Sequence, residues 1–341
     1  MKFRPYGLAG LLVSVLFVYL AVRKVDLIES LRVLSSLDPR WIVASMLVYL
    51  LLALPIRGLR WRLILREQKL LSLKEILAPL YVGYMANNVL PARVGELYRA
   101  HFLGRRARMS RSGAVASIVI ERTFDGLMLV GMVLLLFFLF PHAQFLGHAA
   151  LAMTLVFLAL AVGILFYGFA TAGTDRAVHK ALGLLPERLG QFVGLRLEFF
   201  LKGMRGVSAT GGYLAVGLYT VCAWFFEACA IGLVLGSFRI SLTLSGFVLV
   251  YALSALATAL PSGPGYVGPY QYAFVLSLGA SGISEETALA VSLATQFSLF
   301  GSVIIIGLAL LWKDQLQTQW PLGRRKPGYG DRTVSKKKKA V

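Results

Sequence analysis

The chain alternates long apolar runs with short polar connections that are rich in arginine and lysine. An apolar run of roughly 20 residues is long enough, as a helix, to cross the hydrocarbon core of a membrane. The pattern therefore predicts an all-α polytopic membrane protein. The full crossings that it predicts lie at residues 8–22, 41–56, 113–140, 149–170, 213–235 and 287–312.

Two further apolar segments, residues 76–111 and 242–279, are each broken by a Leu-Pro pair. Proline ends a helix, and basic residues at both ends of the first segment place those ends on the same side of the membrane. A helical hairpin that enters and leaves by one face satisfies both conditions when its tip is buried in protein. We expect two re-entrant hairpins with tips near Pro91 and Pro261. For the second segment, two full crossings are the alternative.

The order of two crossings, one broken hairpin and one crossing occurs twice, in residues 1–140 and in residues 141–312. An odd number of crossings in the first copy inverts the second copy, so the two broken segments approach each other from opposite faces. The sequence therefore predicts an inverted repeat. Residues 313–341 form a basic tail, which we expect to be disordered and cytoplasmic.

Composition agrees with a membrane protein, since 57% of the residues are hydrophobic and only 15% are charged. The net charge of +19 would suit a nucleic-acid partner, but the basic residues lie between the apolar runs and in the tail. Cytoplasmic loops normally carry such residues. We therefore expect a lipid bilayer as the environment and no nucleic-acid partner, with both termini on the cytoplasmic side of the inner membrane. One cytoplasmic connection is predicted to hold Arg57, Arg60, Arg62, Arg66, Lys69 and Lys74.

Charged and amide side chains of the first half occur where the chain could have stayed apolar. Ionisable groups at membrane depth cost several kcal/mol each, so they normally face a wet cavity and mark a substrate path. Helical spacing places Arg93, Glu96 and Arg99 on one face of a helix. It likewise places Glu121, Arg122 and Asp125 on one face of the following helix. A structural ion-pair network is the alternative interpretation. The candidate residues are Asn87, Asn88, Arg93, Glu96, Arg99, Glu121, Arg122 and Asp125.

The second half contributes Glu227, Gly263, Gly265 and Gln271 as candidates. Glu227 lies in an apolar run, so it must either meet an arginine or be protonated. Glycines after Pro261 would let backbone amides approach a headgroup, although close helix packing explains them equally well. We expect no cofactor, because neither a cluster of metal ligands nor a nucleotide-binding loop occurs.

Three motifs, NNVLPARVGELYRA (87–100), ERTFD (121–125) and LPSGPGYVGPYQYA (260–273), occur in this order across nearly the whole chain. In these motifs the chain resembles the lysylphosphatidylglycerol synthase transmembrane-region family, also described as flippase-like membrane proteins. The resemblance implies a lipid-translocating module. Some relatives have Glu at the position of Gln271. The aminoacyl-transferase half of the lysyl-phospholipid proteins is not expected here, because only residues 313–341 follow the last predicted helix.

The resulting hypothesis is a translocator for an anionic phospholipid or a polyprenyl-phosphate-type lipid. Arg93, Arg99 and Arg122 would hold the phosphate by bidentate hydrogen bonds, while the carboxylates orient them. One alternative is a membrane-embedded transferase or hydrolase that acts on a lipid phosphate, ranked second because no nucleophile with a base is evident. Another is a non-catalytic subunit of an envelope-biosynthesis complex.

Overall fold

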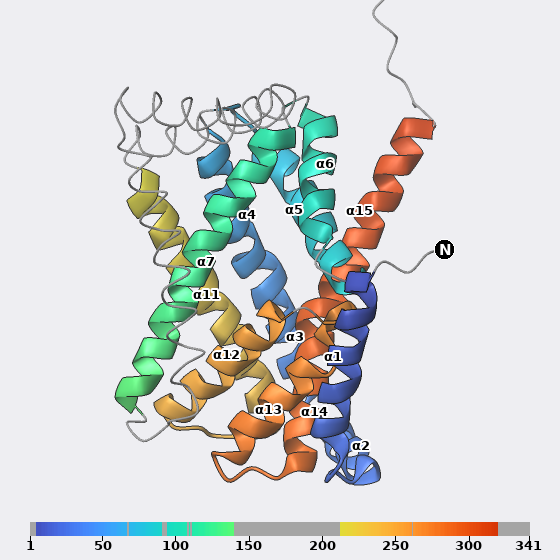
Figure 1. Ribbon diagram of the computed structural model, residues 1–341, viewed down its shortest axis with the longest axis vertical. Helices are drawn as coiled ribbons and strands as arrows, with labels where there is room; N and C mark the ends of the chain where they lie inside the picture. The colour runs from blue at the N-terminus through green and yellow to red at the C-terminus, as the bar shows by residue number, and fades with distance from the viewer. Residues whose placement is uncertain are drawn as a thin grey trace, which may run out of the picture.

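The computed structural model describes residues 5–66, 68–90, 94–107, 109, 111–139, 212–260 and 262–319. Every regular element in these ranges is helical, so the predicted all-α class is confirmed for the described part of the chain (Figure 1). The predicted span 149–170 lies outside the described residues, as do Arg93, both prolines at the predicted tips, and the tail from residue 320.

The helices keep their order along the chain, with two short π-helical turns and one 3-10 turn between them. They are α1 (Pro5–Val22), α2 (Leu27–Ser35), α3 (Pro39–Val48), η1 (Tyr49–Ala53), α4 (Leu54–Leu65), α5 (Leu73–Val89), α6 (Gly95–Ala107), α7 (Arg111–Leu139), α11 (Gly212–Ser237), α12 (Leu244–Ala259), η4 (Pro264–Tyr266), α13 (Pro269–Gly279), α14 (Glu285–Gln296), η5 (Phe297–Gly301) and α15 (Ser302–Gln319).

Three helical stretches of the described residues are long and apolar enough to cross a membrane. They are Pro39–Leu65, which runs through α3, η1 and α4, Gly212–Ser237, and Glu285–Lys313, which runs through α14, η5 and α15. Two shorter apolar helices are Leu12–Val22 and Leu244–Ala259. The chain is thus an integral membrane protein built from apolar helices, while the number of crossings stays a prediction.

The second apolar run extends further than the sequence predicts, and this corrects the assignment of two arginines. The helix continues from the predicted end at Ile56 to Leu65, so Arg57 and Arg60 lie inside α4. They are 6% and 0% exposed, not solvated in a connection. The prediction that Arg57 and Arg60 lie in a cytoplasmic connection was wrong. It rested on the number of nearby basic residues, which cannot reveal the carboxylates far along the chain that pair with these arginines.

Two helical hairpins point at each other from opposite ends of the bundle. In Figure 1, α5 and α6 come from the upper end and α12 and α13 from the lower end, and the helices of each pair pack side by side. Gly95 lets α6 approach α5 closely, since a Cβ there would lie 2.3 Å from the carbonyl oxygen of Gly83. The hairpins meet where α5 packs on η4. Their re-entrant position and the inverted repeat stay predictions.

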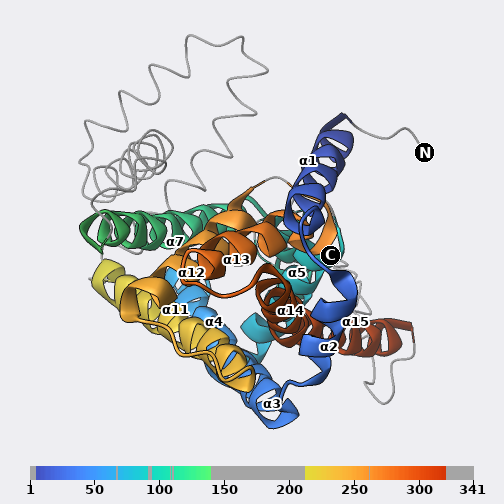
Figure 2. The ribbon, with the colours of Figure 1, turned by 90° about the horizontal axis from the view of Figure 1, so that it is seen from below.

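The remaining helices surround these hairpins with an apolar core. Figure 2 shows α14 near the middle of the bundle, between α13 and α2, and both neighbours pack on it. On another side α11 packs along α3 and α4. Core side chains such as Tyr81, Val250, Phe274 and Leu299 fill the space between them.

Candidate functional site

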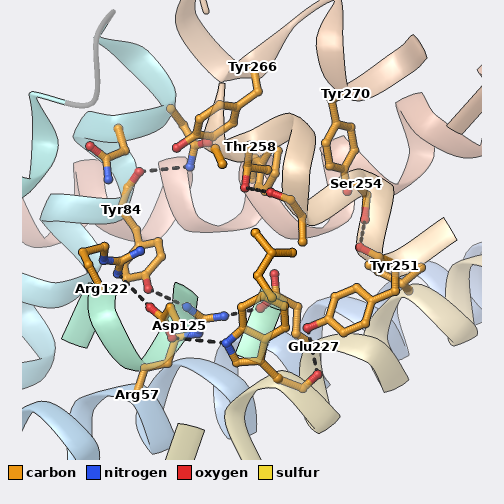
Figure 3. Close-up of a pocket in the computed structure, with 18 of the residues that line it drawn as sticks. Arg57, Tyr84, Arg122, Asp125, Glu227, Tyr251, Ser254, Thr258, Tyr266 and Tyr270 are labelled. Carbon is orange, nitrogen blue, oxygen red and sulfur yellow. Dashed lines mark hydrogen bonds and ion pairs between the residues drawn. The ribbon is translucent and has the colours of Figure 1, made fainter. Parts of the chain in front are cut away.

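A cavity of about 300 Å³ lies where the tips of the two hairpins meet α4, α7 and α11 (Figure 3). Its wall is unusually polar for the inside of an apolar helical bundle. The ionisable residues that line it are Arg57, Glu96, Arg122, Asp125 and Glu227. Each comes from a different helix, except that Arg122 and Asp125 share α7. The cavity therefore depends on the fold of both halves of the chain.

The guanidinium of Arg57 bridges the two halves. It forms an ion pair with the carboxylate of Glu227 on α11, and its Nη1 donates a hydrogen bond of 2.9 Å to the hydroxyl oxygen of Tyr84 on α5. The sequence left two states open for Glu227, an arginine partner or a protonated carboxyl. The structure provides the arginine, although from a position that the sequence had assigned to a loop.

Arg122 is the most open of the buried guanidinium groups, with 31% of its side chain exposed. Its nitrogens lie 3.0 Å from Glu121, 3.4 Å from Asp125 and 3.4 Å from Glu96. These distances place Arg122 between carboxylates of α6 and α7 with one side open to the cavity. A planar group in this position can exchange one carboxylate for a ligand oxygen.

Arg60 and Arg99 lie behind the cavity wall, where they hold the same carboxylates. Arg60 is 2.6 Å from Asp125 and 3.1 Å from Glu121. Arg99 is 2.5 Å from Glu121, and its guanidinium lies 3.6 Å from the centre of the Trp61 ring. These contacts fasten α4 and α6 to α7. Because neither Arg99 nor Glu121 lines the cavity, the structure gives them a supporting position.

Charges in and around the cavity balance in the described part of the chain. Four guanidinium groups, those of Arg57, Arg60, Arg99 and Arg122, face four carboxylates. The carboxylates are Glu96, Glu121, Asp125 and Glu227. Such pairing offsets the desolvation of buried charges. Charges inside the apolar run also predict one ion-paired cluster of Arg93, Glu121, Arg122 and Asp125. Glu121, Arg122 and Asp125 do form ion pairs, which Arg60 and Arg99 extend, whereas Arg93 lies outside the described residues.

Aromatic and hydroxyl side chains form a further part of the wall, and the sequence analysis did not select them. The indole N–H of Trp224 donates to Asp125 at 3.2 Å, which joins this aromatic wall to the charged cluster. A tyrosine in an apolar run is common in any core, so no local signal identified these residues. They are Tyr49, Tyr84, Trp224, Tyr251, Ser254, Thr258, Tyr266 and Tyr270.

Asn87 and Asn88, at the end of α5, also line the cavity. The amide nitrogen of Asn88 donates to the backbone oxygen of Tyr84 at 3.0 Å. Within the part of the chain that the structure describes, the amide oxygens of both asparagines are buried without a hydrogen-bond donor. A buried acceptor without a donor is costly, so the end of α5 carries an energetic cost in this structure.

The glycines and the glutamine of the second hairpin mainly support its turn. The backbone N–H of Gly263 donates to Ser14 Oγ at 2.7 Å, which fits the close-packing interpretation. Gln271 accepts from the N–H of Gly268 at 2.8 Å and donates to Gln296 at 2.7 Å. Gly265 has a φ of +68°, which favours glycine, and lies near Asn88. Gly263, Gly265 and Gln271 do not belong to the described cavity wall.

Comparisons with known proteins give relatives of different lengths. The glycosyltransferase AglD of Haloferax volcanii is 26% identical, and the match covers 88% of this chain and 53% of that protein. The chain thus spans about half the length of AglD. A UPF0104 membrane protein of Methanocaldococcus jannaschii is 26% identical over 66% of this chain and 92% of that protein. Another UPF0104 membrane protein, from Methanothermobacter thermautotrophicus, is 24% identical over 82% of this chain and 86% of that protein.

No solved structure significantly matches the chain. The model of one protein family, described as the lysylphosphatidylglycerol synthase TM region, matches residues 7–307. This range includes all three motifs and every described residue of the cavity wall. The protein therefore belongs to the family of the lysylphosphatidylglycerol synthase transmembrane region.

Proposed function

We propose that the protein moves the polar headgroup of an anionic lipid across the cytoplasmic membrane while the lipid tails stay in the bilayer. The observation that carries the proposal is the polar cavity between two opposed helical hairpins inside an apolar bundle. A headgroup must pass through about 30 Å of hydrocarbon, which is possible only between polar linings. The cavity supplies such a lining near the middle of the bundle.

The proposed orientation places the end of α4, the start of α5 and the turn between α6 and α7 in the cytoplasm. These segments lie at one end of the bundle in Figure 1 and carry many basic residues. Basic loops normally stay inside. In this orientation the chain crosses six times as an inverted repeat, both termini are cytoplasmic, and the two hairpins are re-entrant.

The headgroup phosphate would bind at Arg122, since this guanidinium is partly open to the cavity. Asp125 and Glu96 would hold the guanidinium in place and limit the net charge. Such an arginine offers a planar fork that fits two phosphate oxygens. Arg57 contributes a second positive charge across the cavity. An anionic phospholipid or a polyprenyl-phosphate-type lipid therefore fits, and proteins of envelope biosynthesis are the expected partners.

The family name refers to the synthesis of a phospholipid derivative, which supports a lipid as the substrate. AglD is named a glycosyltransferase, but this chain spans about half of it, so its activity does not transfer directly. The enzyme hypothesis, a lipid-phosphate transferase or hydrolase, differs from transport in one observable. An enzyme changes the mass of the lipid, whereas a translocator changes only its leaflet.

Reconstitution in liposomes tests the proposal. Purified protein is incorporated into liposomes that contain a trace of an anionic lipid with a fluorescent acyl chain, and a membrane-impermeant quencher reports the leaflet. We expect the protected fraction to fall faster than in protein-free liposomes, with the lipid mass unchanged. A new lipid mass without any change of leaflet would instead support the enzyme hypothesis.

A further inference from the structure

The electric charge of the cavity wall limits what can enter the cavity. In the described part of the chain, four guanidinium groups pair with four carboxylates, so these groups are neutral in total when all are ionised. An anionic headgroup would add one negative charge without a matching positive charge. Such a charge is costly inside an apolar helical bundle. A proton or a metal cation that enters together with the headgroup would keep the site neutral.

Two of the four carboxylates are held by more than one arginine. Glu121 lies 2.5 Å from Arg99 and 3.1 Å from Arg60. Asp125 lies 2.6 Å from Arg60. Arg122 adds a further contact to each of these carboxylates, at 3.0 Å and 3.4 Å. If a ligand takes over Arg122, both carboxylates therefore keep at least one other arginine, and neither needs a proton to offset its charge.

Glu96 differs from them, because Arg122 is its one ion-pair partner among the described residues. The two charged groups are 3.4 Å apart, and both residues line the cavity. Their side chains are 25% and 31% exposed, so this pair is the open edge of the charged cluster. A phosphate that approaches Arg122 from the cavity would take the place of Glu96. The carboxylate of Glu96 would then have no arginine partner in the described part of the chain.

Glu227 also has a single arginine partner among the described residues, but its pair is better protected. The side chain of its partner Arg57 is only 8% exposed, and the same guanidinium donates to the hydroxyl oxygen of Tyr84. Arg122 is more open to a ligand that comes from the cavity. The pair of Arg57 and Glu227 therefore stays intact when an anion binds at Arg122.

The other groups around Glu96 favour a neutral carboxyl once a ligand occupies Arg122. Glu96 lies in the first turn of α6, against which α5 and α7 pack. Arg57 and Arg99 are already paired with Glu227 and Glu121. The remaining carboxylates of the site repel a further negative charge. The charged and titratable groups that surround Glu96 in the cavity wall and its ion pairs are Arg57, Tyr84, Arg99, Glu121, Arg122, Asp125 and Glu227.

We propose that the protein carries one proton together with each singly charged headgroup, and that the carboxyl group of Glu96 holds this proton. Before the headgroup binds, ionised Glu96 pairs with Arg122. When the phosphate takes over Arg122, Glu96 takes a proton from the water on the side where the headgroup entered. Release of the headgroup on the other side returns the proton to water there and restores the ion pair.

This cycle keeps the charged groups of the site neutral in total with and without the headgroup. Because the proton and the lipid move in the same direction, a pH difference across the membrane would drive the lipid towards the alkaline side. The inference rests on the proposed function, since it takes the ligand to be an anionic lipid. It deepens that function by naming the ion that is coupled to the lipid.

Lipid binding at different pH values tests the proton uptake. The purified full chain in detergent is titrated with phosphatidylglycerol that carries a fluorescent acyl chain, because its phosphodiester keeps a single negative charge around neutral pH. Since the complex holds one more proton than the separate partners, we expect the affinity to rise about tenfold for each unit by which the pH falls. An affinity that is independent of pH would overturn the inference, and so would an affinity that follows the sodium concentration at constant pH.

Two substitutions at Glu96 assign the proton to this residue. Glu96→Gln is neutral at every pH, so its affinity for phosphatidylglycerol should not depend on pH, whereas Glu96→Asp keeps a titratable group and should keep the dependence. Glu29→Gln is the matched control, because Glu29 also lies in the first turn of a helix and pairs with an arginine, but at an exposed position outside the cavity wall. It should behave like the wild type. A pH dependence that survives in Glu96→Gln would overturn the assignment.

Infrared difference spectra make the same assignment without Glu96→Gln, in case that variant does not fold. Addition of phosphatidylglycerol to the wild type should produce the carbonyl band of a protonated carboxyl group, and this band should shift in Glu96→Asp. The absence of such a band, or a band that is unchanged in Glu96→Asp, would contradict proton uptake by Glu96.

Liposomes with a pH difference separate this inference from the proposed function. When the inside is more alkaline, the wild type should move the labelled lipid into the inner leaflet, so the fraction protected from a membrane-impermeant quencher should exceed its value without a pH difference. Protein-free liposomes under the same pH difference are the control. Translocation that does not respond to the pH difference refutes only the proton coupling. Binding that depends on pH without any change of leaflet refutes translocation and supports the proton uptake at Glu96.

Discussion

Arg60 and Arg122 both pair with Asp125, but they differ in access to the cavity. The Arg60 side chain is 0% exposed and lies behind the wall, whereas 31% of the Arg122 side chain is exposed. Removing one partner of a buried ion pair leaves the other charge uncompensated. The same type of residue therefore has a structural role at one position and a ligand-binding role at the other.

We predict that Arg60→Met destabilises the protein strongly, by about 3 to 5 kcal/mol, because Glu121 and Asp125 each lose a fully buried partner. Thermal unfolding in detergent measures this effect. Arg62→Met on the exposed side of the same helix is the matched control and should leave the unfolding temperature nearly unchanged. A stable, well-folded Arg60→Met variant would show that the buried ion pairs contribute little to the stability of the fold.

Arg122→Lys should affect lipid translocation and leave the stability of the protein nearly unchanged. Lysine keeps the positive charge but loses the planar fork, so we expect near-normal unfolding and about a tenfold loss of lipid translocation. Arg62→Lys provides the control for the exchange itself. Normal translocation in Arg122→Lys would remove phosphate recognition by the fork from the account, and general instability would indicate a structural role instead.

At the same scale, sequence reasoning found some site residues and missed others. Glu121, Arg122 and Asp125 were found because charges inside an apolar run are a local signal. Arg57 and Arg60 were missed because their partners Glu227 and Asp125 lie 170 and 65 residues further along the chain. The lining tyrosines were missed because a tyrosine in an apolar run is equally typical of a core.

At the scale of elements, hydrophobic length predicted most helices of the described chain, and Leu-Pro pairs predicted where two of them break. The hairpin of α5 and α6 and that of α12 and α13 follow this prediction in their helical form. The π-helical turns η1 and η5 were not predicted. They bring Tyr49 and Phe300 into the cavity wall, and hydrophobicity contains no signal for such a local change of winding.

Cysteine labelling tests the arrangement of these elements in the membrane. In a background without Cys222 and Cys229, we expect Arg105→Cys to react only with a reagent on the cytoplasmic side, and Ser281→Cys only from the outside. Both positions are exposed in the structure. Arg105 lies in the last turn of α6 and Ser281 follows the end of α13, and these two helix ends lie at opposite ends of the bundle (Figure 1). Labelling of both positions from the same side would contradict the re-entrant hairpins and the inverted repeat.

At the scale of the whole molecule, charged groups from both halves of the described chain meet inside an apolar bundle. Arg57 and Glu227 connect α4 with α11, and the tip of α5 packs on the turn η4. Hairpins from opposite ends shorten the apolar distance that a headgroup must pass. The central claim is therefore that lipid headgroups cross through this cavity.

Ala255 allows the most direct measurement of that claim. It lies on α12, is partly buried and lines the cavity, so Ala255→Leu fills space without adding charge. The control is Ala309→Leu, the same exchange on the exposed side of α15. In liposomes with equal amounts of folded protein, we predict that Ala255→Leu slows lipid translocation at least tenfold while Ala309→Leu keeps the wild-type rate. Equal rates in all three proteins would contradict passage through the cavity.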